Sequence, residues 1–143
     1  MRLRLLGVGA LAVFVVLAVL DLRLQDRGSG IIPFEIAFSE SRAQEILAEW
    51  GDSGRDTALA SLWIDYLFIA FYGTYLALLM PGRLAALPVA GAACDALENL
   101  FLLLTVGGRA LDFAPVLAGV FAVGKFALLI ATFGYLLARR FRR

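Results

Sequence analysis

The chain has 143 residues, of which 62% are hydrophobic, well above the roughly 45–50% apolar residues of soluble domains, so a single integral membrane domain over residues 1–143 is expected. Thirteen basic and twelve acidic residues leave a net charge of +1, which provides no basic field for nucleic acid. One cysteine, Cys94, and no histidine exclude disulfide frameworks, Cys/His zinc sites and histidine-held haem. We therefore expect no metal site and no cofactor.

Four hydrophobic segments approach or exceed the roughly 20 residues that cross a 30 Å hydrocarbon core. The connections after the second and third segments are tight turns, which make neighbouring helices antiparallel. The sequence therefore predicts an all-α fold, a four-helix antiparallel transmembrane bundle, with spans at about 5–24, 57–80, 84–106 and 113–138.

The first segment is short and follows Arg2 and Arg4, as the hydrophobic part of a cleavable signal peptide would. The residues after it, from Val19 to Leu24, offer no small-x-small cleavage site. We therefore expect this segment to be retained as the first span.

The long first loop contains a predicted amphipathic helix at about residues 40–50. Ser39 or Ser41 can cap its start, and Gly51 can end it. We expect the helix to lie on the membrane or over the mouth of the bundle, with Trp50 at headgroup depth; a partner-docking helix is the alternative. Its apolar positions follow i, i+3, i+4, i+7 spacing, at Ala43, Ile46, Leu47 and Trp50.

The basic residues near the span ends fall on one side of the predicted bundle, which should be cytoplasmic. The first loop is acidic, Glu35 included, and is expected outside. These observations predict a multi-pass protein of the plasma membrane with both termini in the cytoplasm. The basic residues are Arg2, Arg4, Arg83, Arg139, Arg140, Arg142 and Arg143.

Five polar side chains lie within the later spans. A charged group near the bilayer centre costs at least about 2.5–3.5 kcal/mol on insertion scales, so these side chains should face inward. Helical spacing places the members of each span on one face, at similar depths, with Tyr72 aligned with Asp65. The candidate ligand-binding or proton-binding residues are Asp65, Tyr72, Asp95, Glu98, Asn99 and Lys125.

Charge counting predicts that not all of these groups are ionised. Three carboxyls and one ammonium would leave two uncompensated negative charges in a low-dielectric interior. Either carboxyls hold protons, or Arg109 or a bound cation adds positive charge, or water enters from outside. Our hypothesis is that Asp95 and Glu98, one turn apart, share a proton near neutral pH.

Four short segments look like those of a group of uncharacterised small bacterial four-span membrane proteins. This resemblance implies the same fold and brings no activity with it. The layout of four spans with a long outer first loop is also similar, in architecture only, to the EXPERA group of sterol isomerases and sterol-binding proteins. The segments are Gly30-Ile-Ile-Pro-Phe-Glu-Ile-Ala, Asp65-Tyr-Leu-Phe-Ile-Ala-Phe-Tyr, Asp95-Ala-Leu-Glu-Asn-Leu and Lys125-Phe-Ala-Leu-Leu.

Three functions are open at this point. The first is binding or carrying a lipophilic or cationic small molecule, or protons, in a chain whose partners are membrane lipids and, for a carrier, further copies of itself. The second is a structural or accessory subunit in which the polar cluster holds the helices together. The third is an acid–base enzyme acting on a lipid, with Asp65 or Glu98 exchanging protons and Lys125 or Tyr72 stabilising charge.

Overall fold

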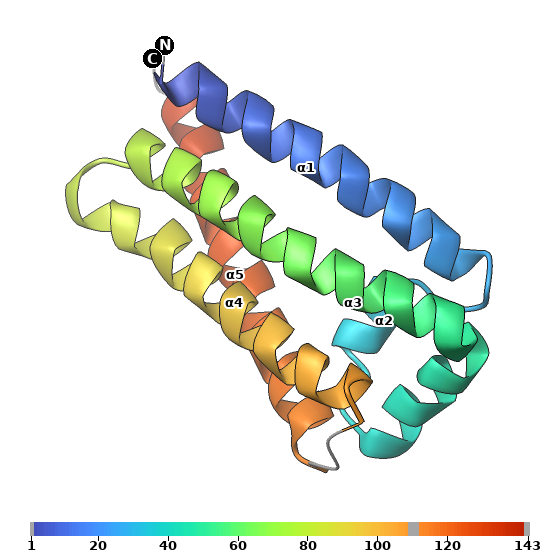
Figure 1. Cartoon of the computed structure of the whole chain (residues 1–143). Coiled ribbons are helices and arrows are strands. Elements are labelled where there is room, and N and C mark those ends of the chain that lie inside the picture. The colour runs from blue at the N-terminus through green and yellow to red at the C-terminus, as the bar shows by residue number, and fades with distance from the viewer. Residues whose placement is uncertain (1, 109–111, 142–143) are drawn as a thin grey trace.

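The computed structural model describes residues 2–108 and 112–141, and every regular element in that part is a helix (Figure 1). Four helices are long and apolar enough to cross a membrane, so the predicted all-α bundle is confirmed and the chain is a multi-pass membrane protein. Arg109, Arg142 and Arg143 lie outside the described residues. The elements are α1 (Arg2–Gln25), α2 (Ile31–Glu35), α3 (Glu40–Leu79), the 3₁₀ helix η1 (Gly82–Ala85), α4 (Ala86–Val106) and α5 (Ala114–Phe141).

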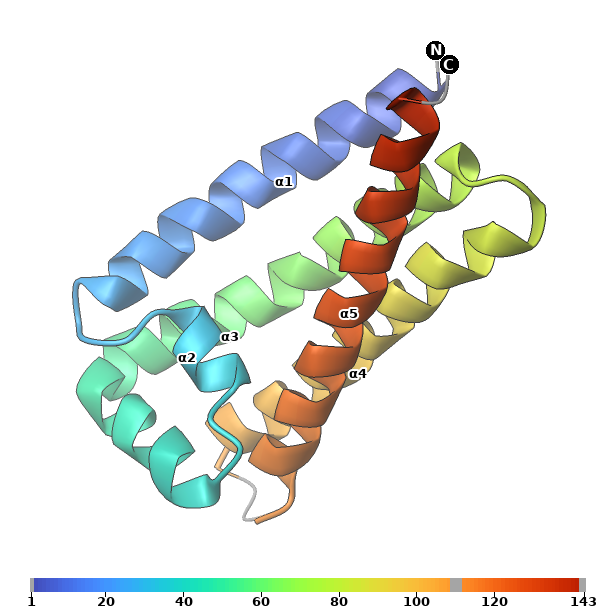
Figure 2. The same ribbon diagram turned by 180° about the vertical axis from the view of Figure 1, so that it is seen from behind.

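The long helices pack in chain order, α1 along α3, α3 along α4, and α4 along α5. They run antiparallel, so that the N-terminal start of α1 and the C-terminal end of α5 lie at the same end of the molecule (Figures 1 and 2). From that end α1 and α5 diverge, and α2 lies between them at the opposite end (Figure 2). As a result, α1 is held mainly by α3.

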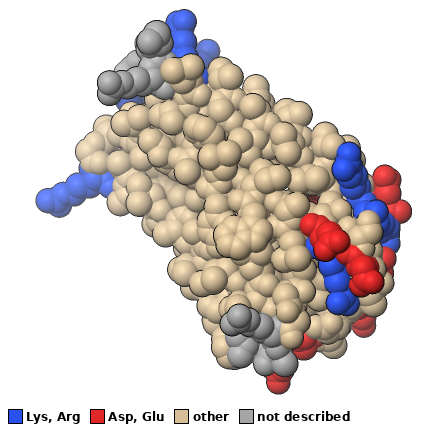
Figure 3. All heavy atoms as spheres, in the orientation of Figure 1, with Lys and Arg blue, Asp and Glu red and all other residues tan. Residues whose placement is uncertain are grey.

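Apolar side chains cover the outside of the long helices, as a hydrocarbon solvent requires. Leu11, Val15, Trp63 and Ile130 are all more than half exposed. On the face that Figure 3 shows, Lys, Arg, Asp and Glu gather at the two ends of the molecule and leave an uncharged band between them. This band is suited to the interior of a bilayer.

The helix α3 is two helices joined at Gly51, whose backbone (φ 61°, ψ −170°) lies in a region that favours glycine. The part before Gly51 is the amphipathic loop helix that the sequence predicts, and the part after it spans the membrane. Ser39 caps the start, because its hydroxyl accepts a hydrogen bond from the backbone N–H of Arg42 at 3.2 Å. The four predicted apolar positions, Ala43, Ile46, Leu47 and Trp50, are all buried.

Trp50 is buried inside the protein and is not exposed on its surface. Its side chain is 2% exposed and packs on Phe34 of α2, with ring centroids 4.9 Å apart. The indole N–H donates to the carbonyl of Ser29, and the Asp21 carboxylate accepts the N–H of Ile31 at 2.6 Å. These contacts fix α2 in place, and the larger core of buried apolar side chains is built around them.

Candidate functional site

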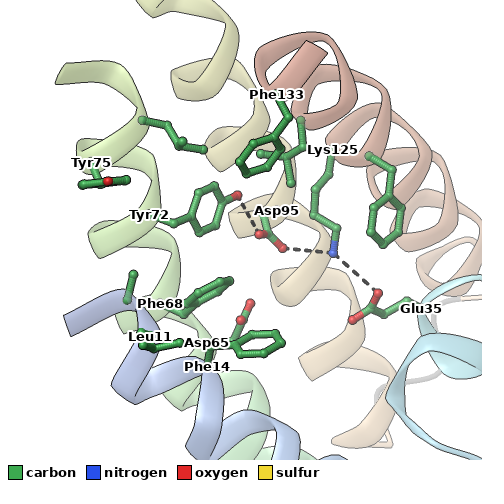
Figure 4. Close-up of a pocket in the computed structure, with 14 residues that line it drawn as sticks. Leu11, Phe14, Glu35, Asp65, Phe68, Tyr72, Tyr75, Asp95, Lys125 and Phe133 are labelled. Atoms are coloured by element: carbon green, nitrogen blue, oxygen red, sulfur yellow. Dashed lines mark hydrogen bonds and ion pairs between the residues drawn. The ribbon is translucent and has the colours of Figure 1, made fainter. Parts of the chain in front are cut away.

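The centre of the site is Lys125 of α5, whose ammonium contacts three carboxylates. Figure 4 shows two of these contacts, with Asp95 and Glu35. The lysine Nζ lies 2.8 Å from Oε2 of Glu98, 3.2 Å from Oδ1 of Asp95 and 3.5 Å from Oε2 of Glu35. It also donates a hydrogen bond of 3.0 Å to Oε1 of Glu98. One lysine thus joins α5 to both α4 and α2.

Two further hydrogen bonds connect α3 to this cluster. The Tyr72 hydroxyl donates to Oδ2 of Asp95 at 2.8 Å, and Nδ2 of Asn99 donates to Oδ2 of Asp65 at 2.7 Å. The structure therefore brings all six sequence-predicted residues into one region, in two parts. One part surrounds Lys125, and the other is the pair of Asp65 and Asn99.

The local sequence explains why these side chains point inward. Asp95, Glu98 and Asn99 share one helix face and are at most 4% exposed, whereas Leu97 and Leu100, on the other side of α4, are exposed. The lysine stem on α5 has room because its neighbours on that face are small. Those neighbours are the fully buried Ala118, Ala122 and Thr132.

Glu35 belongs to the site although the sequence assigned it to the acidic outer loop. Its side chain is 13% exposed and faces Lys125 from the end of α2. Burial raises the pKa of Glu35 above its ordinary value, and the ammonium of Lys125 opposes this effect. The sequence contains one feature that could have identified Glu35 as a site residue. Glu35 is the one charged residue in the otherwise apolar segment from Ile31 to Phe38.

The predicted shared proton between Asp95 and Glu98 has no direct contact to support it. Both carboxylates contact Lys125, and the contacts of the described residues include none between the two carboxylates. Oε2 of Glu98 is buried and accepts no well-directed hydrogen bond from a described residue, although the ammonium is near. With Glu35 added, four carboxyls accompany one ammonium in the described part of the site.

A cavity of about 490 Å³ lies beside the charged cluster, with walls from α1, α3 and α5. Glu35, Asp65, Asp95 and Lys125 contribute its polar surface, and the remaining lining is apolar or aromatic. The lining residues Leu11, Phe14 and Phe133 are each more than half exposed, so the cavity opens at the surface between α1 and α5. In a membrane, this opening faces lipid. The rest of the lining is Ala10, Phe68, Tyr72, Tyr75, Leu76, Phe126 and Leu129.

A second, smaller cavity of about 80 Å³ adjoins the first at Glu35 and Asp65. Ser61 and Asn99 add further polar groups to its wall, and Leu17 and Ile31 close other sides. A space of this size with polar partners can hold a few water molecules. Asp65 therefore borders both spaces.

Comparisons of the chain with protein-family models, curated proteins and solved structures find no match. What the site can do follows from its own geometry. Within residues 2–108 and 112–141, no group of three or more acidic or cysteine side chains is arranged to hold a metal ion. The cluster can hold protons, accept hydrogen bonds from a guest in the cavity, and offset a positive charge.

Proposed function

We propose that the protein binds a lipophilic small molecule that enters its larger cavity sideways, from the bilayer, between α1 and α5. The observation that carries the proposal is the cavity itself, about 490 Å³ with mostly apolar walls and four charged side chains. Small-molecule sites typically measure about 300–1,000 Å³ and combine apolar walls with a few polar groups. In this cavity, the apolar part of a ligand would pack against α1 and α5, and its polar group would contact the carboxylates.

A titration of the purified protein in phosphatidylcholine nanodiscs with the lipophilic fluorophore N-phenyl-1-naphthylamine tests this proposal. Saturable fluorescence enhancement above that of empty nanodiscs is expected. Leu11→Trp fills the cavity mouth and should weaken binding about tenfold or more, because overpacking displaces the guest. Val15→Trp, on the lipid-exposed surface of the same helix and outside the cavity lining, is the matched control. Non-saturable uptake equal to that of empty nanodiscs would contradict the proposal.

A structural role is the second candidate, and one observation favours it for part of the cluster. Glu98 is fully buried, pairs with Lys125 and does not line the larger cavity. Polar contacts between membrane helices contribute on the order of 0.6 kcal/mol each. We therefore assign the pairing of Glu98 and Lys125 to holding α4 and α5 together, and Asp65 and Glu35 to the cavity. Glu98→Gln should lower stability more than Asp65→Asn, measured by denaturant unfolding in mixed micelles.

The orientation is also a proposal. Arg4, Arg83, Arg139 and Arg140 occupy the ends of α1, η1 and α5 that lie at one side of the bundle, which supports a cytoplasmic location for that side in a plasma membrane. Assembly into an oligomer and kinship with the small bacterial four-span proteins likewise remain proposals.

A further inference from the structure

We infer that the ligand carries an ammonium group and that Asp65 receives it, an inference that rests on the proposed binding function. Asp65 differs from the other three carboxylates because Lys125 does not contact it. Its Oδ2 accepts from Asn99, while no described residue donates a hydrogen bond to Oδ1. Asp65 therefore offers the larger cavity an acceptor that the protein itself leaves open.

Aromatic rings lie beside this acceptor in the cavity lining. Phe14, Phe68 and Tyr72 all line the cavity, and their rings lie in a row, with centroids 6.0 Å apart for Phe14 and Phe68 and 5.0 Å apart for Phe68 and Tyr72. In Figure 4 the carboxylate of Asp65 lies beside the rings of Phe14 and Phe68. Aromatic faces attract ammonium groups, and a neighbouring carboxylate adds a charge-assisted hydrogen bond.

The charge of the site points to the same class of ligand. Among the described residues, four carboxyls accompany one ammonium, an excess of acidic groups whose ionised forms a cationic guest would stabilise. An anionic headgroup would add to that excess. A neutral hydroxyl could donate to Asp65 but would leave its charge in place. The chemistry therefore selects a lipophilic amine, with its ammonium at Asp65 and its apolar body towards Leu129 and Phe133.

The test compares dodecylamine, dodecanol and dodecanoate as competitors of N-phenyl-1-naphthylamine in phosphatidylcholine nanodiscs at pH 7.5, with empty nanodiscs correcting for partitioning. Dodecylamine should compete at a concentration at least about tenfold lower than dodecanol, the factor typical of a hydrogen bond to a charged group, and dodecanoate should be weakest. Asp65→Asn should reduce the amine-to-alcohol ratio to about one. Asp56→Asn, an exposed carboxylate on the same helix, should leave the ratio unchanged.

A second variant keeps the inference testable if Asp65→Asn does not fold. Phe68→Leu removes an aromatic face and should lower the amine-to-alcohol ratio about threefold, whereas Phe141→Leu, at the exposed end of α5, should not. Equal competition by amine and alcohol in the natural protein would overturn the inference and leave the proposed function standing. If N-phenyl-1-naphthylamine shows no saturable binding, the proposed function itself is contradicted. An unchanged ratio in folded Asp65→Asn would show that Asp65 is not the receiving group.

Discussion

At the scale of single residues, Glu35 links the stability of the protein to pH. Burial raises the pKa of Glu35 from the ordinary value of 4.5, and the charge of Lys125 opposes this effect. Asp95 and Glu98 are the other ionisable groups that act on it, and Asp65 lines the same cavities. The folded state then binds the Glu35 proton more tightly than the unfolded state does. The contribution of Glu35 to stability is therefore greatest at low pH and declines as pH rises above 4.5.

Replacing Glu35 by Gln should consequently stabilise the protein relative to the natural chain, by an amount that increases with pH. We expect the difference in Tm between the two proteins to grow steadily from pH 4.5 to pH 8, measured by thermal scans in detergent. Asp56→Asn, which changes an exposed carboxylate, should show no such trend. A Glu35→Gln difference that stays constant over this range would contradict the prediction.

The hydroxyl of Tyr72 provides a second prediction at this scale. Tyr72→Phe removes the donor to Oδ2 of Asp95 and leaves that buried carboxylate oxygen without this partner. The free energy of unfolding should fall by roughly 1 kcal/mol, between the values typical of membrane hydrogen bonds and of buried bonds to charged groups. Denaturant titration in mixed micelles measures this change. Tyr75→Phe is the control, because that cavity-lining hydroxyl makes no hydrogen bond with the described residues, and equal losses in both variants would refute the prediction.

At the scale of elements, the short helix α2 is held by α5 on one side, in addition to its contacts with Asp21 and Trp50. Phe38, just after α2, has φ 53°, and its ring packs so closely on Gly119 that a Cβ there would lie 2.5 Å from ring atoms. Gly119→Leu should therefore displace Phe38 and loosen α2, which brings Glu35 to the site. Hydrogen exchange of residues 31–39 should accelerate about tenfold. Gly134→Leu on the same helix is the control, because a Cβ there meets nothing within 4 Å, and it should leave that exchange unchanged. Unchanged exchange in Gly119→Leu would show that the contact with α5 does not hold α2.

The sequence predicted those features of the fold that depend on the residues of a single helix. Apolar length predicted the spans, and helical spacing predicted which face of α4 and of the loop helix is buried. The five-residue α2 was missed because it has no periodicity of its own and depends on distant partners, Asp21 and Trp50. For the same reason the contact between Trp50 and Phe34 was not predicted, since helical spacing does not identify a distant partner. Glu35 was missed together with the helix that carries it.

At the scale of the whole molecule, the divergence of α1 from α5 opens the larger cavity, which connects the charged cluster to the lipid-facing surface. The elements α2, α3, α4 and α5 supply every charged side chain at the larger cavity, and α1 supplies only Ala10, Leu11 and Phe14. No pattern within one helix encodes such an opening, because it depends on how two helices distant in sequence are tilted. The polar face of each later span predicted charged groups at the cavity, but not the entrance between α1 and α5.

The fold also makes the topology testable, because the two ends of the bundle differ in charge. In a Cys94→Ala background, a cysteine at Pro81, beside Arg83, should resist a membrane-impermeant maleimide on intact cells, whereas a cysteine at Asp52 should react. After permeabilisation both should react. Basic residues near short loops are retained in the cytoplasm, so the turn before α4 should be inside and the loop helix outside. The reverse pattern would overturn the orientation and place Glu35, and the carboxylate side of the cavity, towards the inner leaflet.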